Sequence, residues 1–266
     1  MTEQSFLNCT IEDGIAFISI DRPPVNVLGF SHFEILCGKV LEFSQREDIR
    51  VIILMGNNRA FIAGFDIKEI ASMKKAAQVT RVTMRIKRLM MRIEASRKPI
   101  IASVSGSCFG GGLELILACH LRIATFGSKM GLPEINLATI PSFGGTVRLP
   151  KIIGRARALE LILTGNTISG EEAFRIGLIN KVCKDEELLP VVKSLGRSIA
   201  EKGALAVEAA IQSIVSATEV SAEHAMRLES KLSGSLVETK DLKESIAAYF
   251  ERRKAVLNNS LRGGTQ

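Results

Sequence analysis

The chain has 266 residues, of which 46% are hydrophobic and 24% are charged. This composition is typical of a folded globular protein and excludes an intrinsically disordered chain. Lysine and arginine number 35 against 28 aspartate and glutamate residues, and the resulting charge of +7 favours anionic partners without choosing among them. The most apolar long stretch without lysine or arginine, residues 99–121, contains a glutamate and four glycines, so we expect no membrane span and no membrane partner.

The number and spacing of cysteine and histidine residues indicate the redox compartment and whether a metal site is expected. The five cysteines are scattered and odd in number, and the three histidines lack metal-ligand spacing, so we expect neither a disulfide framework nor a metal site. The first four residues carry no basic segment of the kind that opens a targeting peptide. Together these features predict a protein of a reducing compartment, the cytoplasm.

The N-terminal part of the chain alternates between predicted strands and helices. Asp13-Gly14 predicts the turn of a β-hairpin, and short apolar, β-branched runs predict strands that are covered on both faces. Ser31 and Glu34 have the spacing of a capping box, which predicts a helix that starts there. The predicted strands span 51–55, 100–104 and 121–124, and the predicted helices span 31–47, 76–94 and 113–119. This alternation, which continues to about residue 183, favours the α/β class with parallel strands.

The C-terminal part shows only helical periodicity, from residue 185 to residue 257. Gly203, Ser221 and Gly234 interrupt it, and Asp241 with Glu244 predicts the start of the last helix. We therefore divide the chain into a core that carries the active site, 1–200, and a helical region, 201–266. The apolar faces of these helices exceed what their own core can cover, which predicts packing against a neighbouring subunit.

Three segments, residues 60–68, 106–114 and 132–146, stand out as candidates for chemistry. The first two follow predicted strands, where α/β sheets place their ligands. Three glycines, 110–112, precede a helix whose free N–H groups and positive dipole end favour negative charge. The segment lacks the lysine of a nucleotide P-loop.

Each of these segments also has a purely structural interpretation. Glycines before a helix are common in tight packing, and a glutamate in a first turn, such as Glu114, complements the helix dipole. A functional role for this carboxylate is an equal alternative, because an unpaired buried glutamate in an apolar helix is rare. Glu134 taken alone is a surface residue.

Taken together and at these spacings, the three segments resemble the crotonase (enoyl-CoA hydratase/isomerase) superfamily over nearly the whole chain. The resemblance implies a spiral of ββα units followed by a helical trimerisation region, and assembly into a homotrimer or a dimer of trimers. It also implies an acyl-CoA thioester as substrate. No separate cofactor is implied, because coenzyme A is part of the substrate.

The resemblance also assigns the reacting groups. The backbone N–H groups of Phe65 and Gly111 match the oxyanion hole that holds the thioester oxygen. Glu114 and Glu134 match the two carboxylates that flank one water molecule in hydratases and add it, syn, across the 2,3 double bond. Isomerases of the superfamily generally keep one carboxylate or move it, so the presence of both favours a hydratase.

The remaining residues implied by the resemblance contact the substrate. Segment 63–68 contributes Ala63, Asp66, Ile67 and Lys68 to the coenzyme A site, while Tyr249 and Arg252 near the C-terminus match a phosphate-binding pattern that often reaches a neighbour's coenzyme. Many hydratases carry glycine after Ile-Pro in the third segment, where this chain has Ser142 and Phe143. A branched or cyclic acyl group is therefore an alternative to a short linear one.

Two further functions stay open at this point. One is another acyl-CoA activity of the superfamily, such as isomerisation. The other is RNA binding by helix 76–94, because one of its faces carries Arg81, Arg85, Arg88 and Arg92. No aromatic residue is interleaved there for base stacking, and such a stripe is usually a solvated face, so we expect no nucleic-acid partner.

Overall fold

The computed structural model describes residues 6–57 and 59–257. Its centre is a six-stranded sheet with the strand order β1-β2-β4-β7-β9-β12. The pair β1–β2 is an antiparallel hairpin around Asp13-Gly14, and all other neighbours in this sheet are parallel, which confirms the predicted hairpin and the α/β class. The strands are β1 (Leu7–Glu12), β2 (Ile15–Ile20), β4 (Val51–Met55), β7 (Ile100–Val104), β9 (Leu121–Thr125) and β12 (Lys181–Cys183).

Helices cover both faces of this sheet. Along β4, Ile52 and Leu54 enter the larger apolar core, whereas Val51 and Ile53 enter a smaller core on the opposite face. The larger core includes α1 (Phe30–Gln45), α3 (Ala76–Glu94) and α4 (Gly111–Ala118), and the smaller one is closed by α8 (Leu188–Ala200). Successive side chains of a strand point to opposite faces of the sheet. Because both faces are covered by helices, consecutive positions of these strands are apolar.

Several very short strands, none of them predicted, position the segments that follow them. A second sheet has the order β11-β10-β8-β5, and β3 pairs with β6 in parallel. Strands of two or three residues carry no periodicity, so the sequence pattern does not reveal them. Their bounds are β3 (Val27–Leu28), β5 (Ala60–Ile62), β6 (Gly64–Phe65), β8 (Ser107–Phe109), β10 (Lys129–Gly131) and β11 (Thr167–Ser169).

The predicted capping box at Ser31 is wrong, because α1 begins earlier, at Phe30, after the N-cap residue Gly29. The Phe30 N–H donates to a carboxylate oxygen of Glu69 at 2.8 Å, and Glu69 lies in α2 (Ile67–Ser72). A side chain distant in the sequence therefore takes the role that the local pattern assigns to Ser31.

The last helix also starts before its predicted position. Helix α11 (Lys240–Phe250) follows Thr239, whose hydroxyl accepts the N–H of Leu242 at 3.2 Å. The N-cap is therefore Thr239, two residues before the predicted Asp241. Gly234 does not interrupt the pattern but lies inside α10 (Ala222–Leu236), whereas Ser221 caps that helix as expected. The remaining helices are α5 (Gly145–Ile153), α6 (Arg155–Thr164), α7 (Gly170–Arg175) and α9 (Ala204–Ala217), with 3-10 turns η1 (Pro133–Leu137) and η2 (Asp185–Glu187).

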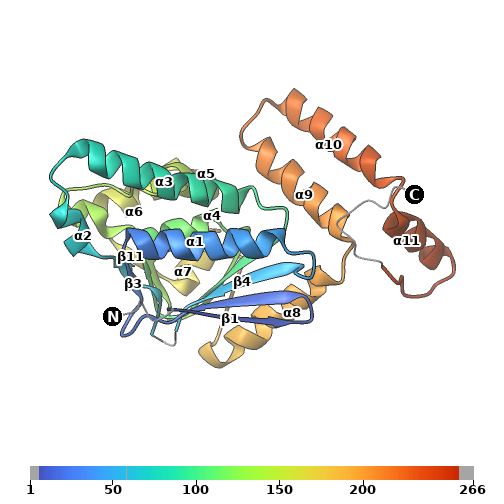
Figure 1. Cartoon of the computed structure of the whole chain (residues 1–266), viewed down its shortest axis with the longest axis horizontal. Coiled ribbons are helices and arrows are strands. Elements are labelled where there is room, and N and C mark those ends of the chain that lie inside the picture. Colours follow the sequence, from blue (N-terminus) through green and yellow to red (C-terminus); the bar gives the residue numbers. More distant parts are fainter. Residues whose placement is uncertain (1–5, 58, 258–266) are drawn as a thin grey trace.

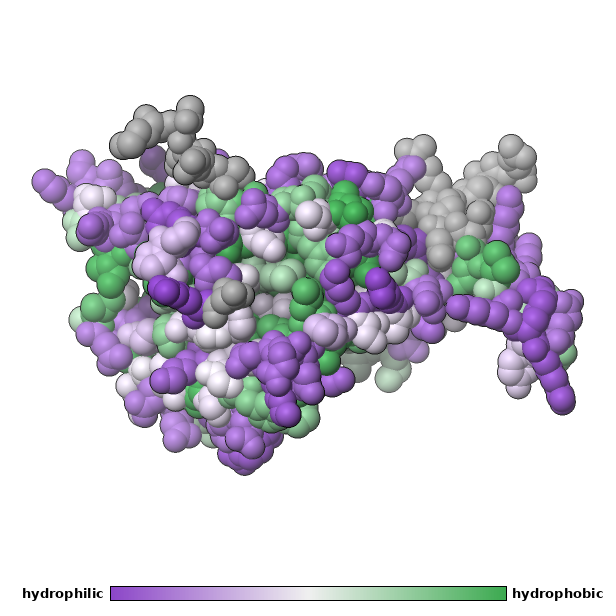
Figure 2. Space-filling view, turned by 90° about the horizontal axis from the view of Figure 1, so that it is seen from below, coloured by the Kyte–Doolittle hydropathy of each residue, from purple (hydrophilic) through white to green (hydrophobic). Residues whose placement is uncertain are grey.

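Helices α9–α11, which we call the helical arm, project from one end of the core (Figure 1). In the described part of the chain after residue 200, the buried apolar residues are three alanines: Ala204, Ala209 and Ala248. Larger apolar side chains of the arm are exposed, and Figure 2 shows apolar patches on the arm as well as on the core. The predicted division near residue 200 falls between α8 and the arm, and the assignment of the two parts as an active-site core and an oligomerisation region stays a prediction.

Within residues 6–57 and 59–257, none of the helices is long and apolar enough to cross a membrane. The same residues include no group of three or more histidine, cysteine, aspartate or glutamate side chains placed to hold a metal ion. The start of the chain, residues 1–4, and the end of the predicted helical region, 258–266, lie outside the described residues.

Candidate active site

A cleft with about 510 Å³ of empty space, part of it open to solvent, lies beside the N-terminal end of α4. It brings together six of the predicted site residues from the three candidate segments of the chain: Phe65, Gly111, Glu114, Glu134, Ser142 and Phe143. The other lining residues come from the start of α1, from α2 and α3, and from the loop after η1: Phe30, Ile70, Met73, Val79, Thr83, Thr139 and Ile140. Most of this lining is apolar, so the two carboxylates are its main charged groups.

Glu114 lies in the first turn of α4 and is only 2% exposed. One of its oxygens, Oε1, accepts the backbone N–H of Phe143 and that of Gly145, both at 2.7 Å. Burial raises the pKa of Glu114, while these two hydrogen bonds and the positive charge of Arg148 oppose the rise. The interpretation of Glu114 as a group that only complements the helix dipole does not account for this enclosure.

Glu134 lies in η1 and lines the same cleft. Burial, together with the nearby charge of Glu114, raises its pKa to about 7. Its Oε2 atom is buried and has no hydrogen-bond partner among the described residues. The two carboxylates therefore differ: Glu114 is held by two N–H donors, whereas one buried oxygen of Glu134 has no hydrogen-bond partner among the described residues.

The backbone of Gly111 and Phe65 forms the wall beside these carboxylates. Gly111 is the first residue of α4, so its N–H has no partner within the helix. Asp66 donates its N–H to the Leu28 carbonyl at 3.0 Å across the pair β3–β6. Since consecutive N–H groups of a strand point to opposite sides, the N–H of Phe65 faces away from β3.

Four phenylalanine rings pack together at the closed end of the cleft. The ring centroids of Phe30 and Phe65 are 4.4 Å apart, and those of Phe33 and Phe143 are 5.2 Å apart. A Cβ atom on Gly111 would lie 2.8 Å from the Phe33 ring and 3.2 Å from the Phe143 ring. Glycine at position 111 suits this packing, since a side chain there would force the two rings to shift.

The structure places the predicted coenzyme-binding residues in two distant regions. Ala63, Asp66, Ile67 and Lys68 adjoin Phe65 in the chain, and Asp66 caps α2 by accepting the N–H of Lys68 at 3.0 Å. Tyr249 and Arg252 lie at the end of α11 in the arm, and Tyr249 is 79% exposed. Within a single chain they do not reach the cleft, which lies at the other end of the molecule near α2 (Figure 1).

Phe30, Phe33 and Arg148 belong to the site but were not predicted from the sequence. The two phenylalanines have the spacing of one helix face, but that pattern does not distinguish a core position from a cleft position. Arg148 is buried and lies behind the loop that contacts Glu114. Its position in α5 carries no local signal, because its partners lie far away in the sequence.

The arginine stripe of α3 is exposed on the opposite side from the apolar residues Ile86, Met90 and Ile93, which are buried in the core. Arg85 in this stripe forms an ion pair with Glu34 of α1 at 2.9 Å. This arrangement agrees with the expected solvated face, and the absence of a nucleic-acid partner stays a prediction.

Comparison with known proteins identifies the family. Residues 10–260 match the family model described as enoyl-CoA hydratase/isomerase. A probable enoyl-CoA hydratase of Bacillus subtilis is 41% identical over 93% of this chain and 96% of its own length, and a crotonyl-CoA hydratase of Syntrophomonas wolfei is 36% identical over 92% and 94%. The crystal structure of an enoyl-CoA hydratase from Bacillus anthracis superimposes with a TM-score of 0.91 at 34% identity, covering 96% of this chain and 100% of that one.

The chain therefore belongs to the enoyl-CoA hydratase/isomerase family, the crotonase superfamily. This confirms the resemblance drawn from the three sequence segments and the crotonase-like fold that it implied.

The coupling between the carboxylates is directly measurable. We expect the side-chain carboxyl carbon of Glu134 to titrate at about pH 7 in a ¹³C NMR experiment. In Glu114→Gln the neighbouring negative charge is gone, so the pKa of Glu134 should fall, while burial keeps it above the ordinary value of 4.5. Glu134→Gln assigns the signal. An ordinary carboxyl titration in the wild type, or no change in Glu114→Gln, would contradict this coupling.

Proposed function

We propose that this protein is a 2-enoyl-CoA hydratase, which adds water syn across the 2,3 double bond of an acyl-CoA thioester. The observation that carries the proposal is the shared cleft of Glu114 and Glu134 beside the N–H groups of Gly111 and Phe65. Hydration needs a group that removes a proton from water, a group that gives a proton to carbon, and donors for the oxygen that becomes negative.

The N–H groups of Phe65 and Gly111 form the oxyanion hole in this proposal. Attack of water at Cβ moves the electrons of the double bond toward the thioester carbonyl, so negative charge collects on that oxygen as an enolate. Preorganised donors aimed at such an oxygen stabilise it, and one donor contributes roughly 2.7–4 kcal/mol in comparable sites. The free N–H at the start of α4 also lies at the positive end of the helix dipole.

The different environments of the carboxylates divide the proton transfers between them. Glu114, which accepts two N–H groups, is the anion that removes a proton from water as its oxygen bonds to Cβ. Glu134, whose pKa is raised to about 7, holds the same water and delivers a proton to Cα as the enolate collapses. After addition Glu114 carries the proton taken from water and Glu134 has lost its own, so a proton passes from Glu114 to Glu134 through the next water that enters, which regenerates the pair. Over a full turnover the substrate gains one OH group and one hydrogen, the elements of one water molecule.

Substrate binding in this proposal uses the segment that contains Ala63, Asp66, Ile67 and Lys68, together with Tyr249 and Arg252 of a neighbouring subunit. Arg252 suits a phosphate because its guanidinium donates in a fixed fork. No separate cofactor is required, since coenzyme A enters as part of the substrate. Ser142 and Phe143 border the acyl end of the cleft, and a branched or cyclic acyl group stays an alternative to a short linear one.

We also propose that the protein assembles as a homotrimer or a dimer of trimers in the cytoplasm. Exposed apolar side chains of the arm, among them Ile214, Val237 and Phe250, support an interface there. The exposure of Tyr249 in a single chain supports a neighbour that brings it to the coenzyme. The five cysteines are free thiols, which supports a reducing compartment.

The carboxylate pair provides the decisive test. We expect the wild type to consume 2-enoyl-CoA thioesters, measured as loss of the ultraviolet absorbance of the conjugated thioester across a panel of chain lengths, branches and rings. Glu114→Gln and Glu134→Gln should each lower kcat by about 10²–10⁴-fold because each removes a proton-transfer group. The double variant should be little worse than the poorer single one, since both groups act on one water.

Glu171→Gln is the matched control, because Glu171 is an exposed glutamate in the first turn of α7 and should leave kcat unchanged. If Glu114→Gln stayed active while Glu134→Gln did not, one carboxylate would suffice. An isomerase would then replace the hydratase.

The oxyanion hole is tested at Gly111. Gly111→Pro removes the N–H at the first helical position, where proline is tolerated. Gly111→Ala keeps the N–H but introduces the same Cβ atom against Phe33 and Phe143, so it controls for packing. We expect kcat of Gly111→Pro to fall about 10²–10³-fold below that of Gly111→Ala. Equal kcat values in the two folded variants would show that this N–H does not contact the reacting oxygen.

Assembly is tested by sedimentation equilibrium at micromolar concentration. We expect the mass of a trimer or of a dimer of trimers. Ile214→Asp, which places a charge on an exposed apolar position of α9, should shift the distribution toward smaller species. A wild type that sediments as a stable monomer would rule out the proposed interface.

A further inference from the structure

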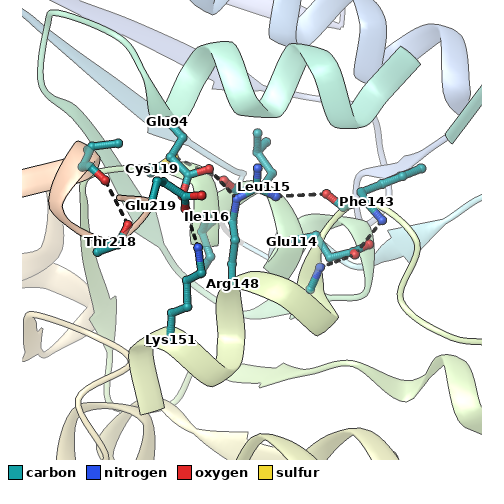
Figure 3. A network of polar contacts seen from close by, with 12 residues as sticks. Glu94, Glu114, Leu115, Ile116, Cys119, Phe143, Arg148, Lys151, Thr218 and Glu219 are labelled. Carbon is teal, nitrogen blue, oxygen red and sulfur yellow. Dashed lines mark hydrogen bonds and ion pairs between the residues drawn. The ribbon is translucent and has the colours of Figure 1, made fainter. Parts of the chain in front are cut away.

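Arg148 is a buried cation in α5, and it lies directly behind the loop that holds Glu114 (Figure 3). Its side chain is 8% exposed, and its Nε donates to a carboxylate oxygen of Glu94, at the end of α3, at 2.9 Å. Its Nη1 donates to the backbone carbonyl of Phe143 at 3.1 Å. The guanidinium thus joins the end of one helix to a loop of the cleft.

The same loop contacts the candidate base from its other side. Phe143 accepts from Arg148 with its carbonyl and donates to Glu114 with its N–H, while Gly145 supplies the second N–H. A Cβ atom on Gly144, whose φ is +112°, would collide with Nη1 of Arg148. Only the glycine turn leaves room for the guanidinium against this backbone.

We propose that Arg148, held in place by Glu94, is a positioning residue for hydration: it fixes backbone 143–145 so that two N–H groups orient the Glu114 carboxylate toward its water. This inference rests on the proposed function. It assigns to Arg148 no contact with substrate, and it makes the orientation of Glu114 depend on an ion pair outside the cleft.

Directional bonding, rather than stability, is what a guanidinium supplies at this position. A buried ion pair adds little stability compared with apolar residues of the same volume, because both charges lose their hydration. The planar guanidinium, in contrast, donates in fixed directions, here to the carboxylate and the carbonyl at once. Small displacements of a catalytic group are costly, and a shift of 1 Å can lower the rate about 10²-fold.

Arg148 also contributes its charge at Glu114. Burial raises the pKa of Glu114, and the N–H groups of the loop, the charge of Arg148 and that of Lys87 on α3 lower it. The other charged group facing this carboxylate across the cleft is Glu134. Loss of Arg148 therefore removes a positive charge and loosens two hydrogen bonds, and both changes raise the pKa of Glu114 further.

The test compares Arg148→Met and Arg148→Lys with Lys151→Met in the full-length protein. Lys151 is the matched control because it lies in the same helix and pairs with a glutamate, Glu219, but does not contact the loop of the cleft (Figure 3). We expect Arg148→Met to lower kcat by about 10²-fold with KM nearly unchanged, because the substrate contacts are retained. The fall of kcat at low pH should also occur at a higher pH than in the wild type, because Glu114, the base, becomes protonated more readily.

Compared with Arg148→Met, Arg148→Lys should recover part of kcat and most of the wild-type pH profile. It restores the positive charge but not the fixed donor geometry of the guanidinium. Glu94→Gln should lower kcat in the same direction by less, and adding it to Arg148→Met should have little further effect. Lys151→Met should match the wild type. A folded Arg148→Met with wild-type kcat and a wild-type pH profile, or one that loses only thermal stability, would overturn the proposal.

A readout that does not depend on activity separates this inference from the proposed function. The carboxyl carbon of Glu114, followed by ¹³C NMR, should titrate at higher pH in Arg148→Met than in the wild type and be unchanged in Lys151→Met. If the wild type fails to hydrate every thioester of the panel but this shift occurs, the hydratase proposal fails and the role of Arg148 at Glu114 stands. An unmoved titration in Arg148→Met overturns the inference whatever the wild type does.

Discussion

The buried carboxylate of Glu114 is the constraint on which the cleft depends. A carboxylate inside an apolar helix is tolerated only when hydrogen bonds replace its lost hydration. Here both direct donors to Oε1 are backbone N–H groups of one loop, from Phe143 and Gly145. The position of α4 therefore determines the path of the loop into α5, and with it the Phe143 ring that closes the cleft.

Strands β4 and β7 were predictable because their signal is local, whereas the start of α1 was not, because the side chain that caps it is distant in the sequence. The runs at β4 and β7 are apolar at consecutive positions since both faces of the sheet are buried, and this shows in the sequence alone. The start of α1 depends instead on Glu69, which lies 39 positions after the N–H that it accepts. A local capping pattern, such as that of Ser31, cannot compete with a contact made only in the folded chain.

The same distinction applies to the candidate site. Glycines 110–112 and Glu114 lie in one segment, and the resemblance to the crotonase superfamily connected them with Phe65 and Glu134 in advance of the structure. The reason for glycine at position 111 was not predictable, because it lies in two rings, Phe33 and Phe143, that approach from other elements. Arg148 was missed on similar grounds: its partners are Glu94 and a backbone carbonyl.

Identical side chains take different roles here because their surroundings differ. Glu114 is buried and Glu134 is partly buried, and burial alone would raise the pKa of each. Two N–H groups and a guanidinium act on Glu114, whereas the main neighbouring charge at Glu134 is the negative one of Glu114 itself. The negative charge on either glutamate thus favours protonation of the other. Because the N–H groups and Arg148 stabilise the anion of Glu114, the proton is carried by Glu134. The division between base and acid therefore lies in the backbone of loop 143–145 and its support, not in the two glutamates.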